Sequence, residues 1–399
     1  MIKESRIENT NLPDGWSIKV LSDFTETING LWTGKKEPYI PVKVYTMSNF
    51  TKGCDLNHSN KGREVIASIS QYEKRKLKYG DIIIEKSGGG PNQPVGRAVL
   101  FNIKNNEENT FSNFTTRLRI CEKNKVDVNS NYLHKFLKLQ YLIGVTEKFQ
   151  KNSTNIRNLQ LKEYLQLEIP LPPLPQQKQI VSILDKAFAA IDRAKANAEQ
   201  NLQNAKELFE SYLQNVFENK GDDCEEKRFD EICVLQRGFD LPTRLRKEGN
   251  YPLVSSNGIT DYVDIWKVKS PGVSTGRSGT IGNIHYIEED YFPLNTSLFI
   301  KEFHGNDERC IYYFLKQFDL SRFESGAGVP TLNRNNVHPV KVYFPISKEE
   351  QKQIAQKLDA LSLETKKLES IYTQKLADLE EMKKSILQKA FSGQLSTIN

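Results

Sequence analysis

Residues 177–217 reappear at residues 351–391 without a gap, at a constant offset of 174. The first copy begins with Gln177-Lys178-Gln179-Ile180, and the second begins with Gln351-Lys352-Gln353-Ile354. A repeat of this length constrains the architecture before any single residue is interpreted. The pattern indicates one unit written twice, each made of a mixed segment followed by a long helix.

Both copies have the apolar spacing of a coiled-coil helix, in which steps of three and four residues alternate. The alternation breaks once in each copy, at equivalent positions: Ala194, Ala198 and Leu202 in the first, and Leu368, Tyr372 and Leu376 in the second. A shared break favours a common packing partner. Each helix would span roughly 65 Å. We expect the alanine-rich seam of the first helix to pair with the leucine-rich seam of the second.

Proline-rich stretches precede both helices, at residues 169–175 and 344–347. Proline stiffens the chain and excludes helix upstream, so these stretches predict hinges between a mixed segment and its helix. The predicted division is 1–172, 173–221, 222–346 and 347–399. The two mixed segments repeat more faintly. Residues 21–30 match 229–238 at an offset of 208, and residues 114–120 match 294–300 at an offset of 180.

Composition narrows the class of protein. No apolar run approaches the roughly 18 residues that a membrane span needs, and residues 1–5 do not resemble a signal peptide, so we expect a soluble, cytoplasmic protein that does not bind membranes. The five cysteines, at positions 54, 121, 224, 233 and 310, lack the spacing of a zinc site or a disulfide framework. They are most simply read as small buried or surface thiols.

Charge is distributed unevenly along the chain. Lys and Arg exceed Asp and Glu by 8 in residues 1–172, whereas residues 222–346 carry a net charge of −3. Bulk basicity is typical of polyanion binders, so it favours nucleic-acid binding by the first mixed segment. The second would need a local basic patch to bind DNA.

The sequence lacks the motifs of catalysis. Residues 30–36 resemble a phosphate-binding loop, but only three residues separate Gly30 from Gly34, and Lys36 stands where Ser or Thr is required. Residues 276–282 are glycine-dense without the spacing of a dinucleotide loop. No metalloprotease, serine-hydrolase or amino-methyltransferase motif occurs, and the five histidines are scattered. These observations favour a non-catalytic binding protein over an enzyme.

Two glycine-rich loops instead suggest close approach of the backbone to a partner. Residues 86–97 and 274–279 surround their glycines with Lys, Arg, Asn, Gln and Ser. Such loops donate N–H and hydroxyl groups to phosphates, while Arg, Asn and Gln can bond to base edges. An ordinary tight turn is the alternative reading for either loop alone, and a solvated charged face explains the basic run at residues 74–78 about as well as DNA binding does.

These features resemble the DNA specificity (S) subunits of type I restriction-modification systems. The resemblance is carried by the proline-entry helices, by residues 385–395 and by Thr275 to Gly282 with residues 292–296. It implies an α+β (mixed α/β) fold with two target recognition domains, joined and separated by two long antiparallel coiled-coil helices with pseudo-two-fold symmetry. The first domain departs from the pattern in its loop, which has Lys86-Ser87-Gly88 where the second has Arg277-Ser278-Gly279.

The resemblance also implies partners and a function. The chain would recognise an asymmetric bipartite target in double-stranded DNA and dock two methyltransferase subunits on its helices, with restriction/translocase subunits in the full complex. S-adenosylmethionine, ATP and Mg would belong to those subunits, with no cofactor, metal or catalytic residue in this chain. A coiled-coil scaffold that binds protein, and the recognition subunit of another type of modification enzyme, are the alternatives.

We expect DNA contacts from eleven side chains, with Arg277 the strongest candidate. They are Lys86, Ser87, Asn92, Gln93 and Arg97 in the first domain, and Arg237, Ser255, Asn257, Arg277, Ser278 and Asn295 in the second.

Overall fold

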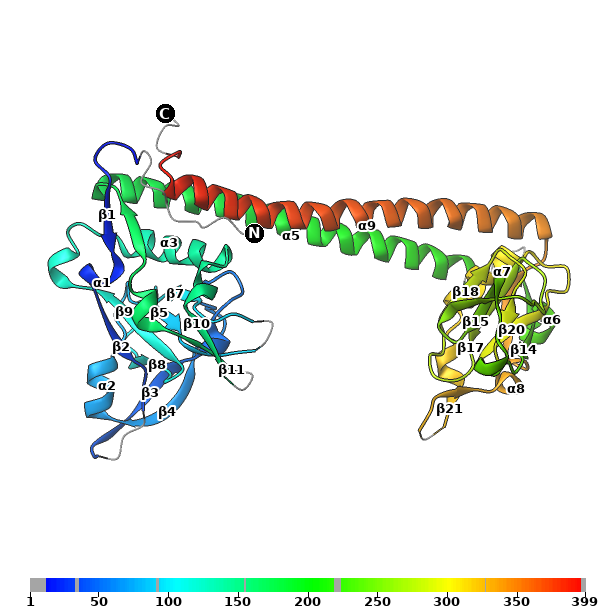
Figure 1. The fold of residues 1–399 in the computed structure, drawn as a ribbon. Coiled ribbons are helices and arrows are strands. Elements are labelled where there is room, and N and C mark those ends of the chain that lie inside the picture. The colour runs from blue at the N-terminus through cyan, green and yellow to red at the C-terminus, as the bar shows by residue number, and fades with distance from the viewer. Residues whose placement is uncertain are drawn as a thin grey trace. The chain divides into compact units, whose positions relative to one another are not determined.

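The repeated sequence forms two long α-helices in the computed structural model of the protein, which describes residues 12–32, 36–90, 93–153, 156–218, 224–326 and 328–395. Helix α5 spans Leu174–Glu218 and helix α9 spans Lys348–Phe391 (Figure 1). Each follows a strand that ends at the predicted proline stretch, β12 (Glu168–Leu171) before α5 and β23 (Lys341–Pro345) before α9. The predicted long helices and their proline entries are confirmed.

The chain divides into two compact units, each with one mixed domain and part of both long helices. The first unit contains residues 1–197 and 376–399, and the second contains residues 198–375. Within the first unit, Lys195 Nζ lies 2.6 Å from Glu380 Oε1, and Lys383 pairs with Asp192. Going from Lys195 back to Asp192 along α5, the paired residue of α9 moves forward from Glu380 to Lys383. The two helices therefore run antiparallel there, as predicted.

In the first unit the domain is built from three sheets and a two-stranded pair. The antiparallel main sheet has the order β2-β9-β5-β7, the second sheet has the order β4-β3-β8 with β8 parallel to β3, the third has the order β10-β11-β6, and β1 pairs with β12. The bounds are β1 Ser17–Val20, β2 Thr25–Asn29, β3 Tyr39–Tyr45, β4 Arg63–Ser68, β5 Ile82–Glu85, β6 Ser87–Gly89, β7 Ala98–Leu100, β8 Asn109–Phe111, β9 Thr115–Ile120, β10 Gln150–Ser153 and β11 Ile156–Leu159.

In the second unit the domain repeats this topology with different sequence. Its main sheet has the order β14-β20-β17-β18, the second sheet has the order β16-β15-β19 with β19 parallel to β15, β13 pairs with β23, and β21 pairs with β22. The bounds are β13 Cys224–Arg228, β14 Val234–Arg237, β15 Glu248–Ser255, β16 Gly258–Val263, β17 Gly272–Gly276, β18 Ile284–Ile287, β19 Phe292–Pro293, β20 Ser297–Glu302, β21 Glu324–Ser325 and β22 Thr331–Leu332.

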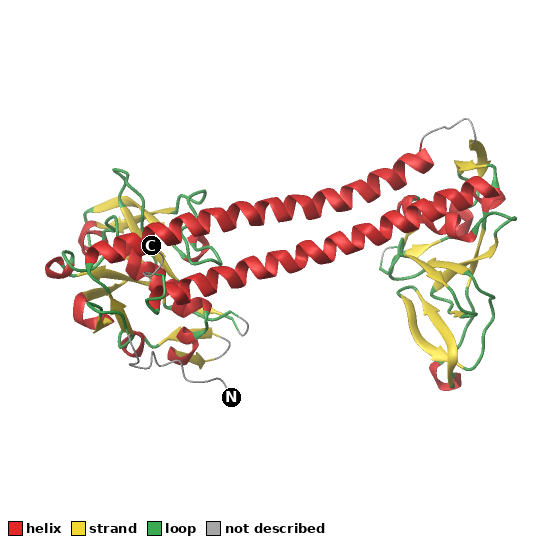
Figure 2. Ribbon diagram, turned by 90° about the horizontal axis from the view of Figure 1, so that it is seen from above, coloured by secondary structure: helices red, strands yellow, loops and turns green. Residues whose placement is uncertain are grey.

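Short helices complete both domains, and in each unit the strands lie together beside the helices (yellow and red in Figure 2). In the first domain these are α1 Leu21–Phe24, α2 Ile69–Arg75, α3 Ser130–Leu142 and α4 Leu161–Tyr164, with 3-10 turns at Met47–Asn49, Glu122–Asn124 and Val145–Phe149. In the second they are α6 Phe229–Ile232, α7 Glu308–Gln317 and α8 Arg334–Val337, with 3-10 turns at Thr243–Leu245 and Leu320–Phe323. The predicted α+β class is confirmed.

Strand pairing confirms one of the two fainter sequence matches and corrects the other. Parallel bridges join Leu31 to Ser112 in the first domain and Phe239 to Leu294 in the second. Leu31 and Phe239 differ by 208, as predicted. Ser112 and Leu294 differ by 182, whereas the sequence match predicted 180. The predicted alignment was wrong by two residues, a slip that leaves every side chain on the same face of a strand.

A buried glutamine fastens each long helix to its domain. Gln177 and Gln351, which begin the two repeats, are fully buried. Gln177 Nε2 donates to Asp127 O and Pro172 O, each at 2.8 Å, and its Oε1 accepts from Asn129 N at 2.8 Å. Gln351 also makes three bonds: its Nε2 donates to Pro345 O and to the side chain of Asn306, and its Oε1 accepts from Asp307 N at the start of α7. The repeated motif is therefore a structural clasp, since it satisfies backbone groups at a helix start that would otherwise be orphaned.

The far ends of the same helices also fill the domain cores. In the first unit the Phe391 ring lies 5.1 Å from the Tyr132 ring and 5.2 Å from the Phe136 ring. In the second unit Phe217, the equivalent residue of α5, lies 5.7 Å from Phe314. Each domain therefore has a core that two separate stretches of chain complete.

Candidate nucleic-acid interface

Lys86 and Arg277 occupy equivalent places in the two domains. In each, two consecutive loop residues donate their N–H groups to one carbonyl, and the first of them accepts from the returning strand. These bonds are Lys86 N and Ser87 N to Phe114 O (2.9 and 3.2 Å), Arg277 N and Ser278 N to Thr296 O (2.8 and 3.2 Å), Leu159 N to Lys86 O (2.8 Å) and Leu332 N to Arg277 O (2.8 Å). The backbone frame is thus shared, and only the side chains on it differ.

In the second domain two of the predicted residues contact one carboxylate, and a third bonds to the backbone of one of them. Asn295 Nδ2 donates to Asp240 Oδ1, and Arg237 Nη2 lies 3.6 Å from the same oxygen. Arg277 Nε donates to the backbone carbonyl of Asn295 at 2.8 Å. This bond holds the guanidinium of a half-buried arginine in one orientation, a precondition for bidentate reading of a base edge. Asp240 was missed by the sequence reasoning.

In the first domain the equivalent pair is lysine and asparagine. Lys86 Nζ donates to Asn29 Oδ1 at 3.0 Å, and Asn29 holds the place of Arg237. Partial burial lowers the pKa of the Lys86 ammonium. The following glycines, Gly30 and Gly238, have no room for a Cβ, which would lie 1.8 Å from Ser112 O and 2.2 Å from Leu294 O. The sequence match of residues 29–30 with 237–238 was the signal that could have identified Asn29.

Ser255 ends β15, and Asn257 lies on the turn between β15 and β16. Asn257 N donates to Ser255 Oγ at 3.2 Å, and the Asn257 side chain is exposed. The turn adjoins the Arg277 loop, because a Cβ placed on Gly276 would lie 3.2 Å from Ser256 Cβ. The predicted residues of the second domain therefore gather on neighbouring loops.

The remaining candidates in the first domain behave differently. Gln93 is exposed on a turn, where its N–H donates to Gly90 O at 3.1 Å, and Asn92 lies outside the described residues. Arg97 is only 7% exposed and makes a two-pronged ion pair with Glu85, at 2.8 and 3.0 Å. Because its guanidinium is buried and paired with the Glu85 carboxylate, Arg97 does not present donors to DNA. The predicted DNA contact by Arg97 is therefore corrected to a structural role.

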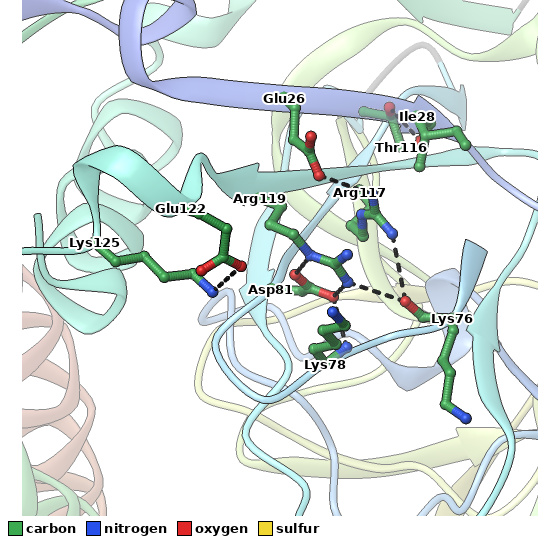
Figure 3. A network of polar contacts seen from close by, with 10 residues as sticks. All are labelled: Glu26, Ile28, Lys76, Lys78, Asp81, Thr116, Arg117, Arg119, Glu122 and Lys125. Atoms are coloured by element: carbon green, nitrogen blue, oxygen red, sulfur yellow. Dashed lines mark hydrogen bonds and ion pairs between the residues drawn. The ribbon is translucent and has the colours of Figure 1, made fainter. Parts of the chain in front are cut away.

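The basic run at residues 74–78 is also tied into the domain. Arg119 donates to both carboxylate oxygens of Asp81 at 2.6 Å and to the backbone carbonyl of Lys76 at 3.0 Å. Figure 3 draws these contacts as dashed lines. Arg117 donates to the same carbonyl, and burial lowers the pKa of its guanidinium. Arg75 Nε donates to Asn29 O at 2.9 Å. This arrangement holds Asn29 in place beside Lys86, so part of the run acts on the interface through the backbone.

A hollow of about 480 Å³ adjoins the Lys86 loop, and sequence reasoning did not anticipate it. Its lining is mostly apolar and includes Leu31, Met47 and the half-exposed ring of Phe114. The Met47 side chain also touches the loop, because a Cβ on Gly88 would lie 2.6 Å from its terminal methyl carbon. The first domain thus presents an apolar surface beside its lysine, where the second has Ser256 and Thr296.

In the part of the chain that the structure describes, no three His, Cys, Asp or Glu residues are grouped as metal ligands. Over the same residues, no helix combines the length and apolarity needed to cross a bilayer.

Comparison with known proteins assigns most of the chain to one family. A family model described as the type I restriction modification DNA specificity domain matches residues 13–203 and 221–379. A putative type I specificity subunit from Mycoplasma pneumoniae is 25% identical over 247 residues, covering 59% of this chain and 65% of that protein. The specificity subunit of the type I restriction enzyme EcoKI from Escherichia coli is 27% identical over 297 residues, covering 71% of this chain and 59% of that protein. The matches span less than two thirds of either relative's length.

Solved structures share the fold over nearly the full chain. A chain from a study of complex assembly and conformational transition of the type I R-M system has a TM-score of 0.76 at 16% identity, covering 96% of this chain and 99% of that chain. The HsdS subunit from Thermoanaerobacter tengcongensis has a TM-score of 0.64 at 16% identity, covering 97% and 99%.

Proposed function

Because the chain belongs to the type I restriction-modification DNA specificity family, we propose that it reads an asymmetric, bipartite target in double-stranded DNA. The observation that carries the proposal is the shared backbone frame of the two reading loops, which presents Lys86 in one domain and Arg277 in the other. A common frame with different side chains suits one docking geometry applied to two different base sequences.

The reading residues differ in kind as well as identity. Arg277 and Arg237 can each form two parallel bonds to guanine O6 and N7. Lys86 is a point charge that can bond to a phosphate or a base acceptor but not in a fixed fork. Half-sites of different sequence would follow, with the first domain (within residues 1–172) reading one and the second (within residues 222–346) reading the other.

The two long helices would hold the partners and set the spacing of the half-sites. Several apolar side chains of the helices face solvent in the second unit, among them Leu363 at 67%, Ile371 at 51% and Leu208 at 60% exposure. Contiguous exposed apolar patches mark surfaces that another protein covers, and these three side chains would supply apolar contacts to such a surface. We assign this surface to two methyltransferase subunits, with restriction/translocase subunits joining in the full complex.

The chemistry would belong to those partners. The chain is the non-catalytic specificity subunit, so S-adenosylmethionine, ATP and Mg would be bound by the modification and restriction subunits. Since the described helices offer no membrane span and the substrate is DNA, we place the complex in the cytoplasm.

Domain exchange tests the proposal. Residues 224–345, from the start of β13 to the end of β23, are replaced by the corresponding segment of another family member, and the methylated sites are sequenced. The expected result is a new sequence in one half-site and an unchanged sequence in the other. The matched exchange of residues 17–171 should change only the opposite half-site. Scrambled or unchanged targets from both exchanges would refute the modular reading.

Salt dependence separates this function from a protein-binding scaffold. Association with DNA should weaken steeply as salt rises, because bound phosphates release counterions. Association of proteins through apolar helix surfaces should change little. A chain whose binding to its target duplex does not respond to salt would favour the scaffold.

A further inference from the structure

Each domain carries a hairpin, here called the arm, that pairs with the loop holding Lys86 or Arg277. The arm is β10–β11 in the first domain and β21–β22 in the second. In the first domain β11 of the arm pairs with β6, placing Asn158 opposite Ser87. In the second domain Thr331 bridges Ser278, the residue equivalent to Ser87. The arms also return to the loops by the same bond, from Leu159 N to Lys86 O and from Leu332 N to Arg277 O. The two arms are therefore equivalent, with an offset of 173 along the chain.

This equivalence relates two exposed apolar side chains, one in each domain, that no sequence match had linked. Ile156 begins β11 and is 49% exposed, while Val329, two residues before β22, is 61% exposed. Their numbers differ by the same 173. A single exposed apolar residue is ordinary on a protein surface. Ile156 lies in β11 and Val329 in the loop before β22, yet both are β-branched apolar residues three positions from the bond to the cationic reading residue. This recurrence in two diverged domains points to a shared ligand.

The ligand must be apolar and yet lie within reach of a phosphate-binding cation. Duplex DNA meets both requirements, since the interior of its base stack is apolar and its backbone is anionic. Contact with a thymine methyl group is the other apolar option, but that contact depends on the base. The residues around the arms differ between the domains, as Phe114 against Thr296 and Asn29 against Arg237. A feature kept where the base-reading residues change should be indifferent to sequence.

We propose that Ile156 and Val329 are wedges, each of which inserts between neighbouring base pairs of its half-site and partly unstacks them. This inference rests on the proposed function. Stiff β-branched side chains suit the role, because few rotamers are lost on insertion. The wedge also serves the partners, since an enzyme that modifies a base must take it out of the stack, and a step already opened lowers that cost.

The test uses the full chain with its methyltransferase subunits, on duplexes of the motif that sequencing of methylated DNA identifies. Each adenine except the one that is methylated, which the methyltransferase itself takes out of the stack, is replaced in turn by 2-aminopurine, whose fluorescence rises on unstacking. The variants are Ile156→Ala and Val329→Ala. Val126→Ala is the matched control, because Val126 is 71% exposed on a loop of the first domain outside the arm.

With the unmodified chain, fluorescence should rise at one step in each half-site. Ile156→Ala should abolish the rise in one half-site only, and Val329→Ala in the other only, while Val126→Ala preserves both. Binding should weaken about fourfold for each CH2 group that the contact buries. No rise with the unmodified chain, or a rise that both arm variants retain, overturns the wedge while DNA binding persists. Failure of the unmodified complex to select any motif would overturn the proposed function itself.

Discussion

The buried glutamine at the start of α9 offers a sharp test of how the long helices are fastened. Gln351 Nε2 donates to Asn306 Oδ1 and Pro345 O, and its Oε1 accepts from Asp307 N, all at 2.8 Å. Gln351→Ala removes three bonds, each worth about 0.5 to 1.5 kcal/mol net, and leaves the Asp307 N–H and the Pro345 carbonyl without their partner. We expect the free energy of unfolding of the second unit to fall by about 2 to 4 kcal/mol.

The repeat supplies its own control. Gln353 lies two residues further along the same helix and is exposed, so Gln353→Ala should change the stability by less than about 0.5 kcal/mol. Gln177→Ala should produce the same loss in the first unit, with Gln179→Ala as its control.

Hydrogen exchange measured by mass spectrometry separates the two units. Gln351→Ala should speed exchange across the first turn of α7, where Asp307 caps the helix, and leave α3 unaffected. Urea unfolding gives the overall loss. If Gln351→Ala and Gln353→Ala behave alike, or if exchange rises equally in both units, the clasp does not fasten the helix as argued.

Four further substitutions test other contacts of the two domains. Arg277→Ala should cost about 1 to 3 kcal/mol of DNA affinity and relax specificity at one position, whereas Lys86→Ala, if Lys86 binds phosphate, should weaken binding to all sequences alike; binding to a panel of duplexes checks both. Arg97→Met leaves the carboxylate of Glu85 buried and unpaired, so unfolding experiments should show a loss of about 3 to 5 kcal/mol, and no loss would refute its structural role. Burial lowers the pKa of His134 from 6.5 to about 4, because the interior disfavours the charged imidazolium. The stability that comes from keeping His134 neutral is therefore fully present above pH 6.5 and is lost progressively as the pH falls toward 4. Unfolding of the first unit measured across that range should lose this dependence in His134→Phe.

The constant parts of the fold could be predicted because their signal is long. The gap-free repeat of 41 residues predicted the helices and their antiparallel pairing, and the proline stretches before it predicted where they begin. The predicted apolar seam does not hold along the whole helix, because Leu368 was expected at the interface and is 37% exposed. Heptad spacing reports which residues could face a partner, and it carries no information on whether a partner is present at that point.

The variable parts resisted prediction for different physical reasons. The match of residues 114–120 was displaced by two because strand side chains alternate, so a shift of two preserves the apolar pattern. Arg97 looked like a DNA contact because its loop is rich in glycine and donors. Its ion pair with Glu85 depends on the pairing of β5 with β7, which places residues 85 and 97 side by side. No local sequence pattern predicts that pairing.

The domain of the first unit owes part of its interior to residues that are synthesised far later. Leu387, Ala390 and Phe391 of α9 are buried in the same cluster as Tyr132 and Phe136. At roughly 5 to 20 residues per second, the ribosome needs on the order of 10 to 40 seconds to make the intervening second unit. Until then an apolar face around α3 stays uncovered. The recognition domain made first is thus the last to be finished, and a nascent chain that stops before residue 376 would expose that face to chaperones and proteases.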